Sequence, residues 1–255
     1  MRYGILLFLF VLLSRMFIAS AQRPSGEAAN IDPLYLVDLP TAGILPTRSG
    51  GADVLLYPEG GVLLSIWYSP IPRTMVGISM GGTRVLGAGG ITWNELPGFS
   101  FRYRIFDENE KYPGLVFGFE SQGKDGWLPK GKKYVVKSPG FFFSVSKNYR
   151  FLGYVSFHGT LNYTLERRDG DGSPNMFVGV EKTVGSMVSV FLEYNFMFDN
   201  DANKKGFWNG MLNSGLRVST EIGLTIDLYF KNLLTNPVHY SKVMREVRVQ
   251  YVRYL

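Results

Sequence analysis

Hydrophobic and polar residues alternate with a period of two over long stretches of the second half of the chain. Between Phe151 and Leu165, the odd positions hold apolar residues or glycine, and the even positions are mainly polar. The same alternation returns between Ile222 and Lys231. Successive side chains of a β-strand point to opposite faces, so each stretch predicts a strand with one apolar and one polar face.

Alternation and turn residues together predict about twelve strands. Their approximate ranges are 51–57, 61–69, 73–82, 97–106, 114–122, 137–147, 151–166, 174–183, 187–198, 207–219, 221–231 and 244–254. The connections alternate between short and long, except that the first, over residues 58–60, is short where a long one is expected. Outer-membrane barrels have short periplasmic turns and longer external loops. We therefore predict an all-β, up-and-down antiparallel transmembrane β-barrel of about 12 strands, within a range of 10 to 14, over residues 51–255.

The N-terminus carries the features of a cleaved signal peptide over residues 1–21. Arg2 gives a positive start, residues 4–13 form an apolar run, and Ala19-Ser20-Ala21 supplies small residues for cleavage. The apolar run is too short for a transmembrane anchor, and Arg15 interrupts it. Residues 22–50 are rich in proline, glycine and small polar residues without clear periodicity. We expect them to form a periplasmic extension, either as a plug-like lead-in to the first strand or as a disordered tail.

The last strand predicts export to the outer membrane of a diderm bacterium. Val247, Val249, Tyr251 and Leu255 share one face, and Tyr254 lies beside the terminus. Outer-membrane barrels often close with such an amphipathic strand, which the barrel-assembly machinery recognises. We therefore expect that machinery, outer-membrane lipid and lipopolysaccharide as partners.

Composition excludes several other classes of function. Signal cleavage removes two arginines and no acid, so the formal charge falls from +6 to +4, without any run of five like charges. Nucleic acid is therefore not an expected partner. The chain has no cysteine, which excludes disulfides, thiolate catalysis and cysteine zinc sites.

The polar face of the strands places charged and amide side chains in the lumen. The candidates are Arg102, Arg104, Glu120, His158, Asn162, Glu193, Arg217, Asp227 and Arg248, with Glu166, Asn195 and Asn213 on the same face. Both signs occur in similar number, and enclosed charges need partners. We expect a lumen packed with compensating ion pairs; the alternative is a narrow polar conduit or a glycan-contacting surface.

Candidates for catalysis and metal binding are weak. His158 could pair with Ser156 two residues earlier on the same face, oriented by Glu193 or Asn195, while His239 lies in an external loop beside Ser241. The acidic clusters at 169–172 and 199–201 lack the bidentate glutamate of an EF-hand and are ordinary turn chemistry. We predict no catalytic residue, no metal and no cofactor.

One predicted external loop combines basic and aromatic residues. The cluster consists of Trp127, Lys130, Lys132, Lys133 and Tyr134. It could contact lipopolysaccharide phosphates or an acidic glycan, although a solvated loop needs no such function.

Several short motifs resemble the YjbH-type outer-membrane proteins. They are Pro40-Thr41-Ala42-Gly43, Trp93-Asn94 with Pro97-Gly98, Ser146-Lys147-Asn148-Tyr149, Lys231-Asn232-Leu233-Leu234 and Arg245-Glu246-Val247-Arg248-Val249. The resemblance spans residue 39 to the end and implies an outer-membrane β-barrel with a non-enzymatic role in exopolysaccharide secretion or surface-glycan handling, with a polysaccharide or secretion partner. The alternatives are a small passive pore and an enzyme that modifies lipid or lipopolysaccharide.

Overall fold

The computed structural model describes residues 18–19, 32–199, 210–235 and 242–255. Within these ranges, no helix is long and apolar enough to cross a membrane. The expected signal peptide lies outside the described residues except for β1 (Ile18–Ala19), whose backbone pairs with Tyr149 and Arg150. Its cleavage stays a prediction. His239 also lies outside the described residues.

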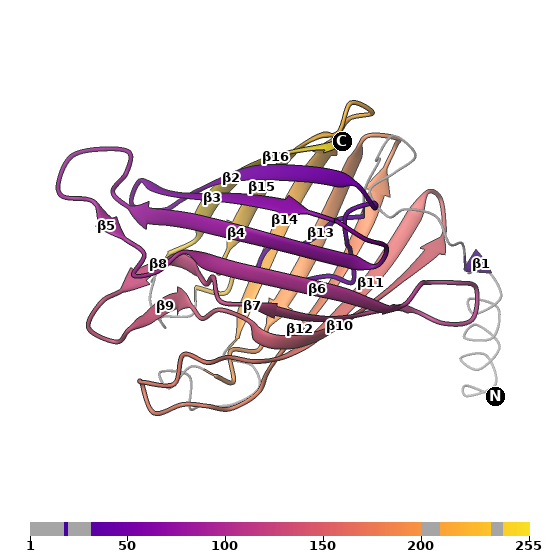
Figure 1. Cartoon of the computed structure of the whole chain (residues 1–255). Helices are drawn as coiled ribbons and strands as arrows, with labels where there is room; N and C mark the ends of the chain where they lie inside the picture. Colours follow the sequence, from indigo (N-terminus) through magenta and orange to yellow (C-terminus); the bar gives the residue numbers. More distant parts are fainter. Residues whose placement is uncertain (1–17, 20–31, 200–209, 236–241) are drawn as a thin grey trace, which may run out of the picture.

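Twelve strands of the described chain form one closed antiparallel barrel (Figure 1). They are β2 (Ser49–Tyr57), β3 (Gly61–Tyr68), β4 (Thr74–Thr83), β6 (Gly98–Phe106), β7 (Gly114–Glu120), β10 (Gly140–Arg150), β11 (Tyr154–Tyr163), β12 (Asn175–Val184), β13 (Val188–Asn195), β14 (Met211–Ser219), β15 (Leu224–Lys231) and β16 (Met244–Tyr254). Each strand pairs with the next, and β16 pairs with β2 from Val247↔Leu56 to Tyr254↔Ser49. The predicted fold class and strand number are confirmed.

Three short strands lie in the connections. β5 (Thr92–Trp93) pairs with the end of β4. β8 (Lys124–Leu128) and β9 (Lys133–Val136) form a hairpin between β7 and β10, which themselves pair directly, from Gly140↔Glu120 to Ser146↔Gly114. The β8–β9 hairpin therefore sits on one end of the barrel and leaves the wall continuous.

The two faces of the strands have opposite chemistry, as the alternation predicts. Large apolar side chains point outward, with exposed fractions near 60% for Ile66, Ile78 and Leu161. The inward positions are buried and mostly polar, such as Ser144, Ser156 and Asp227. An apolar exterior around a polar interior is the pattern of a barrel that spans a membrane.

The two ends of the barrel differ in the length of their connections. The end that holds the C-terminus carries the short connections 69–73, 151–153, 185–187 and 220–223, together with the seven-residue connection 107–113. The opposite end carries 84–97, 121–139, 164–174, 196–210 and 232–243, with 58–60 as its one short turn. We call the first the periplasmic end and the second the external end, following the loop-length rule.

Residues 32–45 fold into the lumen as a hairpin, which we call the plug hairpin. Its arms are joined by hydrogen bonds from Leu36 N–H to the Leu39 carbonyl (3.1 Å) and from Thr41 N–H to the Leu34 carbonyl (3.0 Å). The apolar side chains of the hairpin are almost fully buried; they include Leu34, Leu36, Val37, Leu39 and Leu45. Leu36, Val37 and Leu39 pack in one cluster with wall residues such as Leu55 and Phe191.

Of the alternatives expected for residues 22–50, the plug-like lead-in describes residues 32–45. Residues 32–45 lie within the barrel, and β2 already begins at Ser49. The physical reason is that apolar side chains and backbone groups of the segment find partners on the lumen wall that they would lack outside. Residues 22–31 lie outside the described part of the chain.

Candidate functional site

The nine residues predicted to line the lumen all lie on the inner face of the wall. Eight are buried to 5% exposure or less, and the side chain of Arg104 is 18% exposed near the periplasmic end. Most of them contact the plug hairpin or each other, so the site is the lumen together with its plug.

Arg102 of β6 holds both arms of the plug hairpin. Its guanidinium donates to the carbonyls of Leu34 (2.9 Å) and Gly43 (3.2 Å), while Nη2 donates to Glu120 Oε1 of β7 (2.7 Å). The same carboxylate oxygen accepts a hydrogen bond from the Tyr35 hydroxyl (2.7 Å). A planar guanidinium with five donors suits this multiple bonding.

Arg217 of β14 binds the hairpin from the opposite side of the barrel. Its Nε and Nη2 donate to the two oxygens of Asp227 (2.8 and 3.1 Å), and Nη1 donates to Glu181 (3.2 Å). Nη2 also donates to the Tyr35 carbonyl (2.7 Å). The bidentate contact with Asp227 fixes the orientation of the guanidinium.

Glu193 of β13 holds the tip of the plug hairpin. Its carboxylate accepts hydrogen bonds from three successive backbone N–H groups, those of Val37 (2.8 Å), Asp38 (2.9 Å) and Leu39 (2.9 Å). Asn213 donates a fourth bond to the same carboxylate (3.0 Å). One side chain of the wall therefore satisfies the three backbone donors at the tip of the plug hairpin.

A buried charge cluster joins the plug hairpin to the β8–β9 hairpin. Lys231 of β15 contacts Asp38 of the plug (3.0 Å), Asp125 of β8 (2.5 Å) and Glu246 of β16 (3.4 Å). Lys124 of β8 donates to the Val37 carbonyl (2.5 Å). The lumen is thus closed by the plug from the periplasmic end and by β8 from the external end.

The remaining predicted lumen residues also have partners. Arg248 forms an ion pair with Asp53 (3.0 Å), and Asn162 donates to the Pro139 carbonyl (2.9 Å). Arg104 donates to Asp32 and to the Ala42 carbonyl, both at 2.8 Å. The expected charge-compensated lumen is what the described residues form.

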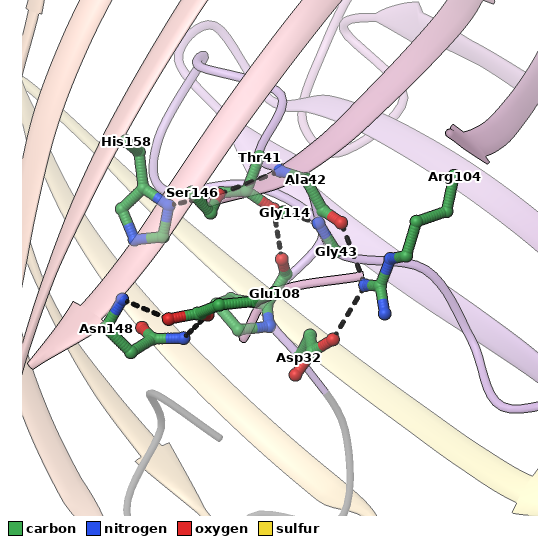
Figure 2. A pocket seen from close by; sticks show the side chains of 11 residues that line it. Asp32, Thr41, Ala42, Gly43, Arg104, Glu108, Gly114, Ser146, Asn148 and His158 are labelled. Atoms are coloured by element: carbon green, nitrogen blue, oxygen red, sulfur yellow. Dashed lines mark hydrogen bonds and ion pairs between the residues drawn. The ribbon is translucent and has the colours of Figure 1, made fainter. Parts of the chain in front are cut away.

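His158 pairs with a serine other than the one we expected. Its Nδ1 lies 2.8 Å from Ser146 Oγ, a cross-strand neighbour on β10, and that oxygen accepts from the Ala42 N–H (3.0 Å) (Figure 2). Ser156, the predicted partner, forms no side-chain hydrogen bond among the described residues. The cavity beside Ser146 and His158 has about 40 Å³, which is room for water molecules only.

The external basic-aromatic cluster is divided between several contacts. Trp127 and Tyr134 pack edge to face, with ring centroids 4.9 Å apart. Lys133 pairs with Asp169 (2.7 Å), and Lys132 lies 3.8 Å from Glu95, while Lys130 is exposed. Lys132 and Lys133 therefore connect the β8–β9 hairpin to acids of neighbouring loops.

The described residues contain no group of three or more histidine or acidic side chains that could hold a metal ion. Burial alone would raise the pKa of the Asp169 carboxyl. Hydrogen bonds from Lys133 and Lys137 outweigh this effect and hold the pKa below its ordinary value. Burial raises the pKa of the Asp199 carboxyl to about 7. Asp201 lies outside the described residues.

Sequence reasoning missed the residues that join elements far apart in the chain. Asp38, Asp125, Glu181 and Lys231 are all buried in ion pairs. Lys231 follows the polar alternation of its strand and could have been added on that signal; Asp38 and Asp125 lie outside any periodic segment.

These features define a transmembrane β-barrel of twelve strands with a lumen plugged by its own N-terminal segment. No family model matches the chain, and no curated protein matches it. Among solved structures, the chain is similar to a NanC porin at 11% identity, over 81% of this chain and 99% of that one, with a TM-score of 0.38. A likeness at this level assigns no function.

Proposed function

We propose that the protein is a non-enzymatic pore of the outer membrane that residues 32–45 hold closed. The observation that carries this proposal is the polar lumen wall, whose donors and acceptors are occupied by backbone groups of the plug hairpin. Water can replace those backbone groups when the hairpin leaves, because arginine, glutamate and aspartate side chains are readily hydrated.

The topology of the plug supports this proposal. The hairpin enters the lumen near Arg104, turns at Val37 to Leu39, and returns to β2 at the same end. It can therefore be withdrawn toward the periplasmic end without breaking any strand pairing of the wall. Barrels of 8 strands fill with their own side chains and those of 16 to 18 leave a channel, so a twelve-stranded lumen fits a removable filler.

Conductance across a planar lipid bilayer tests the proposal. The full chain should be almost silent, and a variant lacking residues 32–45 should conduct steadily. A retained heat-dependent gel shift would show that the deleted variant is still a folded barrel. A folded but silent variant would refute the pore.

A disulfide lock supplies a matched control. The chain has no cysteine, and Ala42 of the plug lies against Ser146 of the wall. The double variant Ala42→Cys with Ser146→Cys should stay silent when oxidised and open as rarely as the natural chain when reduced. Equal openings in both states would show that conduction does not pass the plug.

The other roles weighed from the sequence have separate tests. The exopolysaccharide role rests on the family resemblance, and a deletion strain assayed for surface polysaccharide tests it. The alternative of a lipid-modifying enzyme would be supported only by an esterase activity of the natural chain that His158→Ala abolishes. The diderm outer membrane, its lipids and the assembly machinery stay predictions, supported by the apolar exterior and the loop lengths.

A further inference from the structure

A cavity of about 230 Å³ lies at the external end of the wall, where β7 and β10 meet. β7 ends at Glu120 and its partner β10 begins at Gly140, and the chain between them forms the β8–β9 hairpin. Figure 1 shows this hairpin at the end of the barrel that carries the long loops. Residues of the hairpin line the cavity together with the loops that precede β6 and follow β11.

One side of the cavity is apolar and continues the outer surface of the barrel. It is formed by Leu96, Pro97, Phe119 and Leu165. Leu96 and Leu165 are 71% and 55% exposed, and Phe119 occupies an outward position on β7. These side chains would face acyl chains near the membrane boundary.

The other side of the cavity carries two cations, Lys132 and Arg168. Lys132 lies 3.8 Å from Glu95, and both side chains are about half exposed. Arg168 is exposed and forms no hydrogen bond or ion pair within the described part of the chain. A free guanidinium at the rim of a partly apolar cavity is available to an anion.

The carboxylates that line the cavity already have partners. Glu120 accepts from Arg102 and Tyr35 inside the barrel. Glu166 accepts from the backbone N–H groups of Tyr134 (2.8 Å) and Ser138 (2.9 Å). The third carboxylate, Glu95, lies near Lys132, so Arg168 is the charged side chain of the lining that has no partner among the described residues.

A row of phenylalanines continues the apolar side toward the middle of the membrane. Phe119 lies 4.9 Å from Phe141, and Phe117 lies 5.1 Å from Phe143, measured between ring centroids. Phe141 and Phe143 are about half exposed on the outside of β10. An aromatic surface below a cavity that holds an unpaired guanidinium matches an acyl chain below an anionic headgroup.

We propose that this cavity binds the phosphorylated headgroup of an outer-leaflet glycolipid, with one acyl chain against the phenylalanine row. Arg168 and Lys132 donate to the phosphate oxygens, and Leu165 and Phe119 contact the first part of the acyl chain. The proposal rests on the outer-membrane location in the proposed function, and it is independent of the plug and of conduction.

Native mass spectrometry of the detergent-purified full chain tests this binding. The probe is lipid A with both phosphates, compared with the same lipid after removal of the phosphates. Arg168→Ala should weaken binding of the phosphorylated lipid about tenfold, as for the loss of one charge-assisted hydrogen bond. Lys130→Ala, an exposed lysine of the same hairpin outside the cavity, should leave binding unchanged.

A second variant separates a lipid site from a simple anion site. Phe119→Ala should weaken lipid binding severalfold while leaving the heat-dependent gel shift intact. Glucosamine phosphate without acyl chains should bind at least a hundredfold more weakly than the lipid. Equal binding of this headgroup alone, equal binding of the dephosphorylated lipid, or no difference between Arg168→Ala and Lys130→Ala would each overturn the proposal. Conductance of these variants should match the natural chain, so a failed pore test and a failed lipid test remain distinguishable.

Discussion

Glu193→Ala should open the plugged barrel without unfolding it. The variant removes the one acceptor shared by the N–H groups of Val37, Asp38 and Leu39, which lie at the buried tip of the plug hairpin. A buried donor that loses its acceptor costs about 1–3 kcal/mol. The closed state therefore loses at least about 3 kcal/mol, whereas an open state that exposes these groups to water loses none of this.

The effect of that loss depends on how close the closed and open states of the plug are in free energy. Burial of its six large aliphatic side chains contributes roughly 9–18 kcal/mol, and fixing the backbone of the segment costs a free energy of the same order. The polar anchors therefore decide the position of the equilibrium. Since about 1.4 kcal/mol is tenfold in an equilibrium constant, the open population should rise at least a hundredfold.

Single-channel recording measures this change directly. The frequency of full-conductance openings in Glu193→Ala is compared with that of the natural chain and of the variant lacking residues 32–45. Glu110→Ala is the matched control, because this acid is exposed and its side chain forms no hydrogen bond or ion pair in the described structure. The opening frequency of Glu193→Gln should lie between those of Glu193→Ala and the natural chain, because the amide oxygen of glutamine still accepts hydrogen bonds.

The reasoning would be refuted if Glu193→Ala opened no more often than Glu110→Ala while the deleted variant conducted. That outcome would mean that apolar burial alone holds the plug. If the two Glu193 variants lost the heat-dependent gel shift while Glu110→Ala kept it, Glu193 would instead be needed for folding of the wall.

Three further predictions concern the loops and the charge cluster. Burial raises the pKa of Asp199 to about 7, above its ordinary value of 3.8, so the loop after β13 should be most stable when this carboxyl is protonated. The folded loop should lose about 4 kcal/mol of stability as the pH rises from 4 to 7. Proteolysis of the loop should therefore be faster at pH 8 than at pH 5, and Asp199→Asn should remove the difference. Asp169→Asn breaks the contacts with Lys133 and Lys137, so trypsin added to intact cells should cut the β8–β9 hairpin about tenfold faster; equal rates would show that these pairs do not hold the loop. Lys231→Met removes the cation that Asp38, Asp125 and Glu246 share and should cost about 3–5 kcal/mol. This cost should be measured as a lower urea midpoint of the gel shift, and an unchanged midpoint would mean that these acids are neutral.

The barrel itself follows from local sequence, because the period of two and the turn residues recur along the chain. Once a strand is recognised, alternation also fixes which side chains face inward, and it places Arg102, Glu120 and Arg217 in the lumen. These conclusions need no knowledge of which strands lie opposite one another.

The partners of those residues are set by contacts between distant parts of the chain. Lys231 and Asp38 are separated by 193 positions, and no periodic signal marks the segment that contains Asp38. The error at His158 has a related cause. Residues two apart on one strand lie almost 7 Å apart, whereas cross-strand neighbours such as Ser146 approach to about 5 Å, so the register between strands decides the hydrogen bond.

The charge balance at the tip explains why Glu193 is the decisive test of the plug. Around the tip, the described structure gathers four acids, Asp38, Asp125, Glu193 and Glu246, against Lys124 and Lys231. Withdrawal of the plug hairpin removes Asp38 and leaves Lys231 with two carboxylates, whereas Lys124 loses both its ion pair with Asp38 and its hydrogen bond to the Val37 carbonyl. The ion pairs of Lys231 with Asp125 and Glu246 can keep the β8–β9 hairpin in place while the plug moves. Withdrawal also sacrifices the acceptor that Glu193 provides for the plug backbone, together with the burial of its aliphatic side chains.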